Sequence, residues 1–192
     1  MTNPTNKQII LASNSPRRRQ LLRQIISDFE IAEPRDIEES YPPTLPVEDV
    51  APYLSELKAN AFSDLLKTDK LLITADTVVI LEDKILGKPH SRDEAVEMLK
   101  KMRDKVHNVI TGVTLKTKDK TITFCSKTAV HFDNLSDQEI ESYVDEFQPY
   151  DKAGAYGIQE WIGCRGIKEI EGCFYNVMGL PLNLLYKQLS DF

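Results

Sequence analysis

A continuous apolar run, Leu71–Leu81 (LLITADTVVIL), constrains the fold of this chain more than any other segment. The run is rich in β-branched residues and predicts a central strand of a sheet. Asp76 stands in its middle. A carboxylate in an apolar strand destabilises the fold if it is left unpaired, so Asp76 needs a metal, a cationic partner or a cleft to face. The alternative is an Asp at a strand end that hydrogen-bonds a neighbouring turn.

The segment before this run alternates between strand and helix patterns. Residues 8–12 form a short apolar strand that leads into Ser15 and Pro16, which suit the N-cap and first position of a helix. We expect a second strand near 29–32 and a helix over 47–66.

The segment after it predicts the same mixture. It contains capping boxes opening helices at Ser91 and Ser136, paired strands over 106–117 and 121–132, a β-hairpin around Gly172, and a last helix near Pro181. No repeat or linker appears. The sequence therefore predicts one α/β domain over residues 1–192, with a mixed β-sheet and flanking helices, built either as one body or as two lobes.

Composition excludes several classes of protein. The 192 residues include 24 Lys and Arg and 30 Asp and Glu, a net charge of −6. This acidic balance argues against duplex nucleic acid as a partner. Apolar runs are too short for a membrane span, and the first residues lack a secretory pattern, so we expect a cytoplasmic protein with no membrane partner. The 3 cysteines form no CxxC pair and suggest neither a disulfide framework nor a zinc site.

A group of hydroxyl and guanidinium side chains surrounds the first strand-to-helix turn: Ser13, Ser15, Arg17 and Arg18. Backbone N–H groups at a helix start, hydroxyls and guanidinium groups together suit the oxygens of a phosphate. The turn lacks the glycines and the Gly-Lys-Ser/Thr ending of a P-loop. A solvated basic helix start is the alternative reading.

Two lysines and an acidic loop add weaker signals. Lys58 interrupts an apolar helical stripe, and Lys88 lies on a rigid bend between Gly87 and Pro89. With the arginines they supply the positive charge that a chain of phosphates requires, although a lysine on an apolar face commonly only extends to solvent. Glu39 lies in an acidic loop that could supply a ligand for Mg²⁺ or Mn²⁺, ions that favour oxygen.

A glycine-marked segment, Lys152–Gln159, forms the last candidate. Gly154 and Gly157 let the backbone approach a ligand closely, while Tyr156 and Gln159 offer an aromatic ring and an amide. An amide can read a pyrimidine edge because it donates and accepts at once. The alternative is a simple connector.

Five motifs carry a resemblance to a known family. In chain order they are LASNSPRRRQLL, ITADTVV, LGKP, DKAGAYGIQ and GLPL. They resemble the motifs of the Maf family of nucleoside triphosphate pyrophosphatases, and the resemblance runs from about Ile9 to Leu185. It implies a fold similar to the inosine triphosphate pyrophosphatases, two lobes around a central cleft. It also implies hydrolysis of a nucleoside triphosphate to the monophosphate and pyrophosphate, a divalent metal cofactor such as Mg²⁺ or Mn²⁺, and a homodimer.

The resemblance assigns roles to individual residues. Asp76 is the catalytic proton acceptor or a metal ligand, or both, and Glu39 is the acidic loop residue. The phosphate and substrate ligands are Ser13, Ser15, Arg17, Arg18, Lys58 and Lys88. Arg17, Thr77 and Gln159 match the branch of the family that acts on dTTP and UTP. One departure is visible, because family members often continue with Gly after the GIQ of the late loop and this chain has Glu160-Trp161.

Three other functions remain open from the sequence. The same reaction could act on modified or purine triphosphates such as 7-methyl-GTP, which share the phosphate machinery. The family is also associated with inhibition of septum formation, a role that binding alone could serve, although a pure binder has no need of Asp76 beside the cations. Nucleic-acid binding through Arg17–Arg19 is disfavoured by the net charge.

Overall fold

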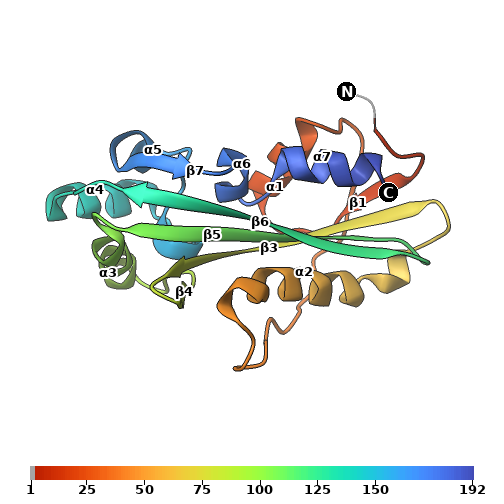
Figure 1. Ribbon diagram of the computed structural model, residues 1–192, viewed down its shortest axis with the longest axis horizontal. Coiled ribbons are helices and arrows are strands. Elements are labelled where there is room, and N and C mark those ends of the chain that lie inside the picture. The colour runs from red at the N-terminus through yellow and green to blue at the C-terminus, as the bar shows by residue number, and fades with distance from the viewer. Residues whose placement is uncertain (1–2) are drawn as a thin grey trace. The chain divides into compact units, whose positions relative to one another are not determined.

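The computed structural model describes residues 3–192 (Figure 1). The chain divides into two compact units. Unit 1 contains residues up to 76, 111–126 and 179–192. Unit 2 contains residues 77–110 and 127–178. Neither unit is continuous in sequence, because strands β3, β5 and β6 each begin in one unit and end in the other.

One seven-stranded mixed sheet runs through the chain, with strands in the order β2-β1-β3-β5-β6-β7 and with β4 paired to β3. Strand β1 pairs in parallel with both β2 and β3, whereas β4 and β7 pair antiparallel with β3 and β6. The mixed sheet of the sequence prediction is therefore confirmed. The strands are β1 (Gln8–Leu11), β2 (Glu30–Ile31), β3 (Lys70–Leu81), β4 (Lys84–Leu86), β5 (Val106–Lys116), β6 (Thr121–Phe132) and β7 (Ile167–Glu171).

In unit 1, the parallel pairing of β1 with β3 brings together segments that are far apart in the chain. Leu11 is in register with Ile73, and the Ala12 N–H donates to the Ile73 carbonyl at 3.0 Å. Parallel neighbours continue in the same direction. The turn after Leu11 and the strand residues after Ile73 therefore leave this pairing on the same side, which places the phosphate-binding candidates beside the Asp76 segment.

Helices flank the sheet of unit 1, with α2 on one side and with α1 and α7 on the other (Figure 1). Gly112 of β5 shows how closely α2 packs, because a Cβ there would lie 2.3 Å from the Pro52 nitrogen. The helical segments are α1 (Pro16–Arg23), η1 (Val47–Asp49), α2 (Val50–Ala61), η2 (Ser63–Leu65) and α7 (Leu182–Ser190).

The continuous helix predicted over 47–66 is wrong in its extent. The α-helix ends at Ala61, and the chain then tightens into the single turn η2. The Phe62 N–H donates to the Ala59 carbonyl, three residues back, and the Phe62 side chain is buried. Tertiary burial of this ring therefore ends a helix that the apolar pattern alone would continue.

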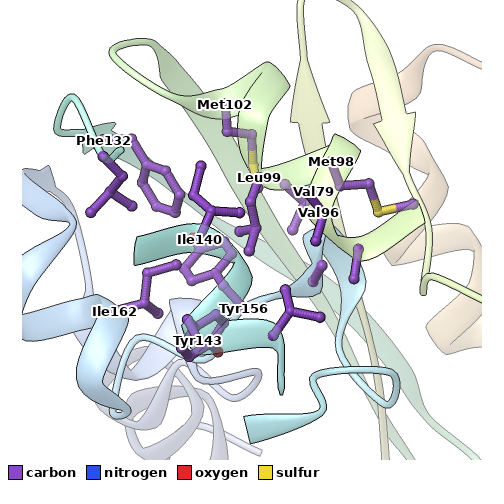
Figure 2. Packing of buried hydrophobic residues seen from close by; sticks show 14 of the residues in the cluster. Val79, Val96, Met98, Leu99, Met102, Phe132, Ile140, Tyr143, Tyr156 and Ile162 are labelled. Carbon is purple, nitrogen blue, oxygen red and sulfur yellow. The ribbon is translucent and has the colours of Figure 1, made fainter. Parts of the chain in front are cut away.

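Unit 2 has its own hydrophobic core between strand and helix residues, seen closely in Figure 2. Leu99, Ile140, Tyr143, Tyr156 and Ile162 meet there, from three helices and the glycine-marked loop. The helical segments of this unit are α3 (Arg92–Met102), α4 (Asp137–Phe147), η3 (Ala153–Ala155), α5 (Trp161–Arg165) and α6 (Phe174–Val177). The core therefore fixes one side of the loop that carries Gln159.

The predicted helix starts of unit 2 are confirmed with one difference. Ser136 and Glu139 form the complete capping box of α4. Ser91 caps α3 by accepting from the Glu94 N–H, but the Glu94 carboxylate accepts from the His90 N–H instead of the Ser91 N–H. Both caps still satisfy donors of the first helical turn.

The β-hairpin predicted around Gly172 is wrong. Strand β7 before Gly172 pairs with β6, and the chain after it forms the short helix α6. Gly172 has φ 136°, and a Cβ there would lie 2.7 Å from the Thr128 hydroxyl oxygen. The glycine thus permits the backbone to approach β6 closely. Pairing with β6, which is distant in sequence, determines the path of the chain where the local pattern had suggested a hairpin turn.

No helix within residues 3–192 combines the length and the apolar character that crossing a bilayer requires.

Candidate functional site

Asp76 lies in β3 and is paired with a lysine from α2. Its Oδ1 is 2.5 Å from the Lys58 Nζ, and both side chains are largely buried. The same nitrogen lies 3.0 Å from Oε1 of Glu39, which is half-exposed. Of the three environments predicted for Asp76, a metal, a cationic partner or a cleft, the structure shows the cationic partner, and Lys58 contacts two carboxylates at once.

Buried hydroxyl groups fix α2 against β3 just before this pair. The Thr74 hydroxyl donates to the Ser55 carbonyl at 2.6 Å, and the Ser55 hydroxyl bonds the Thr114 hydroxyl at 2.8 Å. Lys58 lies about one helical turn beyond Ser55, and Asp76 lies two residues beyond Thr74. The hydroxyl contacts therefore set the register in which the ammonium meets the carboxylate.

The turn between β1 and α1 is ordered by its own serines. Ser15 is the N-cap of α1, and its hydroxyl accepts from the Arg18 N–H at 3.4 Å. The Ser13 hydroxyl accepts from the Ser15 N–H at 3.2 Å. The first turn of α1 contains no acidic residue, so no side chain of that turn offsets the positive end of the helix dipole.

Arg18 joins three segments of unit 1. Its Nε donates to the Gly179 carbonyl at 2.8 Å, and its Nη1 donates to the Ala75 carbonyl at 2.9 Å. Burial lowers the pKa of Arg18, while the charge of Asp76 acts in the opposite direction. Gly179 has φ 107°, a conformation that favours glycine and that directs the carbonyl here. Arg18 was predicted as a substrate ligand, and in this structure it also holds the residue before Asp76.

Arg19 has a role that sequence reasoning missed. Its Nε and Nη2 donate to the Ser13 carbonyl at 3.3 and 3.1 Å. The guanidinium thereby joins α1 to the backbone at the start of the turn. The sequence could not predict this contact of Arg19, because its acceptor is a backbone carbonyl and every residue type has one.

A divalent cation fits the carboxylates of unit 1 only as a shared site with a substrate. Within residues 3–192, no three His, Cys, Asp or Glu side chains gather as a metal-binding group. Asp76 and Glu39 nevertheless lie within 3.0 Å of one nitrogen, so their oxygens converge on one positive charge. Mg²⁺ is commonly held by one or two carboxylates together with phosphate oxygens. The donor set present therefore fits such an ion.

Unit 2 contains the three other predicted residues: Thr77, Lys88 and Gln159. Lys88 is exposed on its bend, and the Gly87 carbonyl beside it accepts from the Gly154 N–H at 3.0 Å. This bond joins the lysine turn to the glycine-marked loop, on which Gln159 is exposed. Thr77 is partly buried and follows Asp76 directly in β3.

The predicted residues therefore form two sets, each described within its own unit. Arg18 and the Asp76–Lys58–Glu39 cluster are linked in unit 1, next to the serine turn. Lys88 and the Gln159 loop are linked in unit 2.

A sequence model of the Maf-like protein family matches residues 8–192. Relatives of similar length are named dTTP/UTP pyrophosphatase. The protein of this name from Parabacteroides distasonis is 51% identical over 185 residues, covering 96% of each chain. The one from Bacteroides thetaiotaomicron is 50% identical over 183 residues, covering 95% of each chain.

A solved structure supports the fold independently of sequence. The Ham1 protein of Staphylococcus aureus superposes with a TM-score of 0.57 over 96% of this chain and 99% of its own, at 18% sequence identity. At this identity the likeness concerns the fold alone.

Proposed function

The chain belongs to the Maf family, and from that premise we propose that it is a nucleoside triphosphate pyrophosphatase that hydrolyses dTTP and UTP to the monophosphate and pyrophosphate. The observation that carries the proposal is the Lys58–Asp76 pair beside the serine and arginine turn. A partly buried carboxylate next to anion-binding groups is what hydrolysis of a phosphoanhydride requires. The names of the relatives supply the identity of the base.

The triphosphate is bound by the start of α1. Ser13 and Ser15 order the turn, and Arg17 and Arg18 belong to the first turn of α1. Backbone N–H groups and the helix dipole favour an anion at this position. Lys88 supplies a further charge from its exposed bend.

Asp76 accepts the proton of the attacking water. The water oxygen forms a bond to phosphorus in line with the anhydride oxygen, and the bond to that oxygen breaks, so pyrophosphate leaves with the electron pair. Lys58 holds the Asp76 carboxylate in place and balances its charge. The reaction consumes one water and needs no other reactant.

Asp76 and Glu39 are the residues that would hold Mg²⁺ or Mn²⁺. A bound divalent ion neutralises the charge on the phosphate oxygens and makes phosphorus easier to attack. The Lys58 ammonium already contacts both carboxylates and shares this neutralising role within the protein.

The base is read first by Gln159. The Gln159 amide offers one donor and one acceptor to the edge of uracil or thymine. Thr77 and Arg17 complete the set that the family resemblance assigns to this branch. We further propose that residues 1–192 act as one domain, because three strands run through both units, and that the protein is a cytoplasmic homodimer, as the resemblance implies.

The test is product release by the purified protein with Mg²⁺ or Mn²⁺ on dTTP, UTP, CTP, ATP, GTP, ITP and 7-methyl-GTP. We expect pyrophosphate from dTTP and UTP, and loss of most turnover in Asp76→Asn. Asp64→Asn is the matched control, because Asp64 forms an exposed ion pair with Arg35. Activity on a purine would reject the base assignment, and silence on every substrate would favour a binding role instead.

A further inference from the structure

The end of the glycine-marked loop is held by side chains that have no role in the hydrolysis described above. We propose that Tyr143, Glu160 and Lys152 form a clamp that positions the Gln159 amide, which makes Tyr143 and Glu160 positioning residues for base discrimination. The inference rests on the proposed function, in which Gln159 reads the base. Its evidence comes from contacts within unit 2 alone.

Tyr143 is the centre of the clamp. Its side chain lies in the core of unit 2 (Figure 2), and its ring stacks on that of Phe147. Its hydroxyl accepts from the Gly157 N–H at 3.1 Å and donates to the Glu160 carboxylate. Burial, together with the Glu160 charge, raises the pKa of Tyr143 well above its usual range, so the hydroxyl keeps its proton. One oxygen therefore ties the loop backbone to a side chain three residues further on.

Glu160 is held from its other side by a lysine. Its Oε1 lies 3.1 Å from the Lys152 Nζ, and the exposed fractions of the two side chains are only 17% and 10%. Lys152 also contacts Asp151 at 2.8 Å. Removing an ion pair from water costs free energy that its attraction repays only in good geometry. The pair therefore restricts where the loop end can lie.

Gly157 links the clamp to Gln159. A Cβ at Gly157 would lie 2.9 Å from the Gln159 Nε2 and 2.8 Å from the Glu160 Cδ. The Gln159 amide and the Glu160 carboxyl group thus both lie over the same glycine. A shift of Glu160 would open space into which the Gln159 amide can move.

The first part of the loop is fixed by different contacts. The Tyr156 hydroxyl bonds His107 Nε2 at 2.8 Å, and the Gly154 N–H donates to the Gly87 carbonyl. Gly154 and Tyr156 are therefore held by contacts outside the clamp. What Tyr143 and Glu160 add is the placement of the segment from Gly157 to Glu160.

The experiment compares bases on the same triphosphate. The readout is the ratio of kcat/KM for UTP to that for CTP, because these substrates differ only in the base. We expect Tyr143→Phe to lower this ratio about tenfold or more by misplacing the amide, with kcat for UTP near the wild-type value. Tyr150→Phe is the matched control, since Tyr150 is an exposed tyrosine.

A double-mutant cycle distinguishes an effect of Tyr143 on the position of the Gln159 amide from a general increase in the flexibility of the loop. If Tyr143 acts through Gln159, adding Tyr143→Phe to Gln159→Ala lowers the ratio no further than Gln159→Ala alone. Glu160→Gln, which keeps an acceptor for Tyr143 but loses the charge facing Lys152, should give a smaller effect of the same kind. An unchanged ratio in Tyr143→Phe, or additive effects in the cycle, would overturn the proposal.

A second readout does not depend on hydrolysis. In ¹⁵N-labelled protein, Tyr143→Phe should shift the side-chain amide signals of Gln159 and speed exchange of the Gly157 N–H. If the wild-type protein cleaves no triphosphate, the proposed function is rejected and these signals alone decide the clamp. Unchanged Gln159 and Gly157 signals would then reject the clamp as well.

Discussion

The Nζ of Lys58 lies 2.5 Å from Oδ1 of Asp76, with the Glu39 carboxylate on the same nitrogen. This arrangement makes Lys58 the charge balance for two carboxylates as well as a candidate phosphate ligand. A triphosphate that approaches must share the ammonium with them. Binding of a triphosphate to Lys58 would therefore change the positive charge that acts on Asp76, the proposed base.

Replacing Lys58 by Met should abolish most turnover. The two carboxylates would then lose the ammonium group that they share, and Asp76 would lose the contact that holds its side chain. We expect kcat to fall about a hundredfold or more, measured as pyrophosphate release at saturating UTP. Lys116→Met, at a half-buried lysine that bonds Asn60, is the control and should retain the wild-type rate.

Glu39→Gln tests the carboxylate that is half-exposed. An amide is a weaker ligand for a hard cation than a carboxylate. We expect the Mg²⁺ concentration for half-maximal rate to rise, while the rate at saturating Mg²⁺ falls much less than in Asp76→Asn. A Mg²⁺ titration of the initial rate measures this. An unchanged titration curve would remove Glu39 from the metal site.

Arg18→Lys should lower both stability and turnover. A lysine has a single donor nitrogen, so it lacks the fixed spacing of Nε and Nη1 with which the planar guanidinium reaches the Gly179 and Ala75 carbonyls. We expect the free energy of unfolding to fall by about 1–3 kcal/mol for a carbonyl left without its donor, and kcat to fall as the residue before Asp76 loosens. Urea unfolding and UTP kinetics measure the two effects. Arg23→Lys, at an exposed helix end, should change neither.

Gly112→Ala should destabilise unit 1. The new Cβ would lie 2.3 Å from the Pro52 nitrogen, so α2 must move away from the sheet. We expect a loss of about 3 kcal/mol in the free energy of unfolding, at the upper end for overpacking, measured by urea denaturation. Gly87→Ala is the control, because nothing lies within 4 Å of a Cβ there. Equal stability of the two variants would contradict this packing.

His107 should make the protein sensitive to acid. Burial, and to a smaller extent the charge of His131, lowers the pKa of His107 from 6.5 to about 3. Below pH 6.5 this histidine is protonated in the unfolded chain but stays neutral in the folded protein. The free energy of unfolding therefore falls as the pH falls from 6.5 toward 3. Between pH 7.5 and pH 5 we expect a loss of about 2 kcal/mol from this residue. His107→Gln should lack that part of the loss, whereas His90→Gln, at an exposed histidine, should keep it.

Elements with a strong local signal were predictable. The strand that contains Asp76 followed from an unbroken apolar run, and α1 followed from Ser15 and Pro16. The end of α2 and the path around Gly172 depend on burial of Phe62 and on pairing with β6. Such partners are distant in sequence, so periodicity could not reveal them.

In the candidate site, too, some features could be predicted from residue types and others depend on contacts that the sequence does not reveal. The cost of an unpaired carboxylate predicted a partner for Asp76, and the structure supplies Lys58. The acceptors of Arg18 are backbone carbonyls, which leave no mark on the residue types around them. The resemblance led us to expect glycine where this chain has Glu160, but only the fold shows that the Glu160 carboxylate meets Tyr143 and Lys152.

The contacts of Arg18 also bear on when this site can form during synthesis. Arg18 follows strand β1, and its acceptor Ala75 lies in β3. The paired strands β1 and β3 are about sixty residues apart in the chain, a separation that slows folding. The Arg18–Gly179 hydrogen bond joins residues 161 positions apart. A ribosome must therefore release Gly179 before the arginine finds its second acceptor. Until then the nascent chain lacks the hydrogen bond from Arg18 to Gly179, and this side of the site is incomplete.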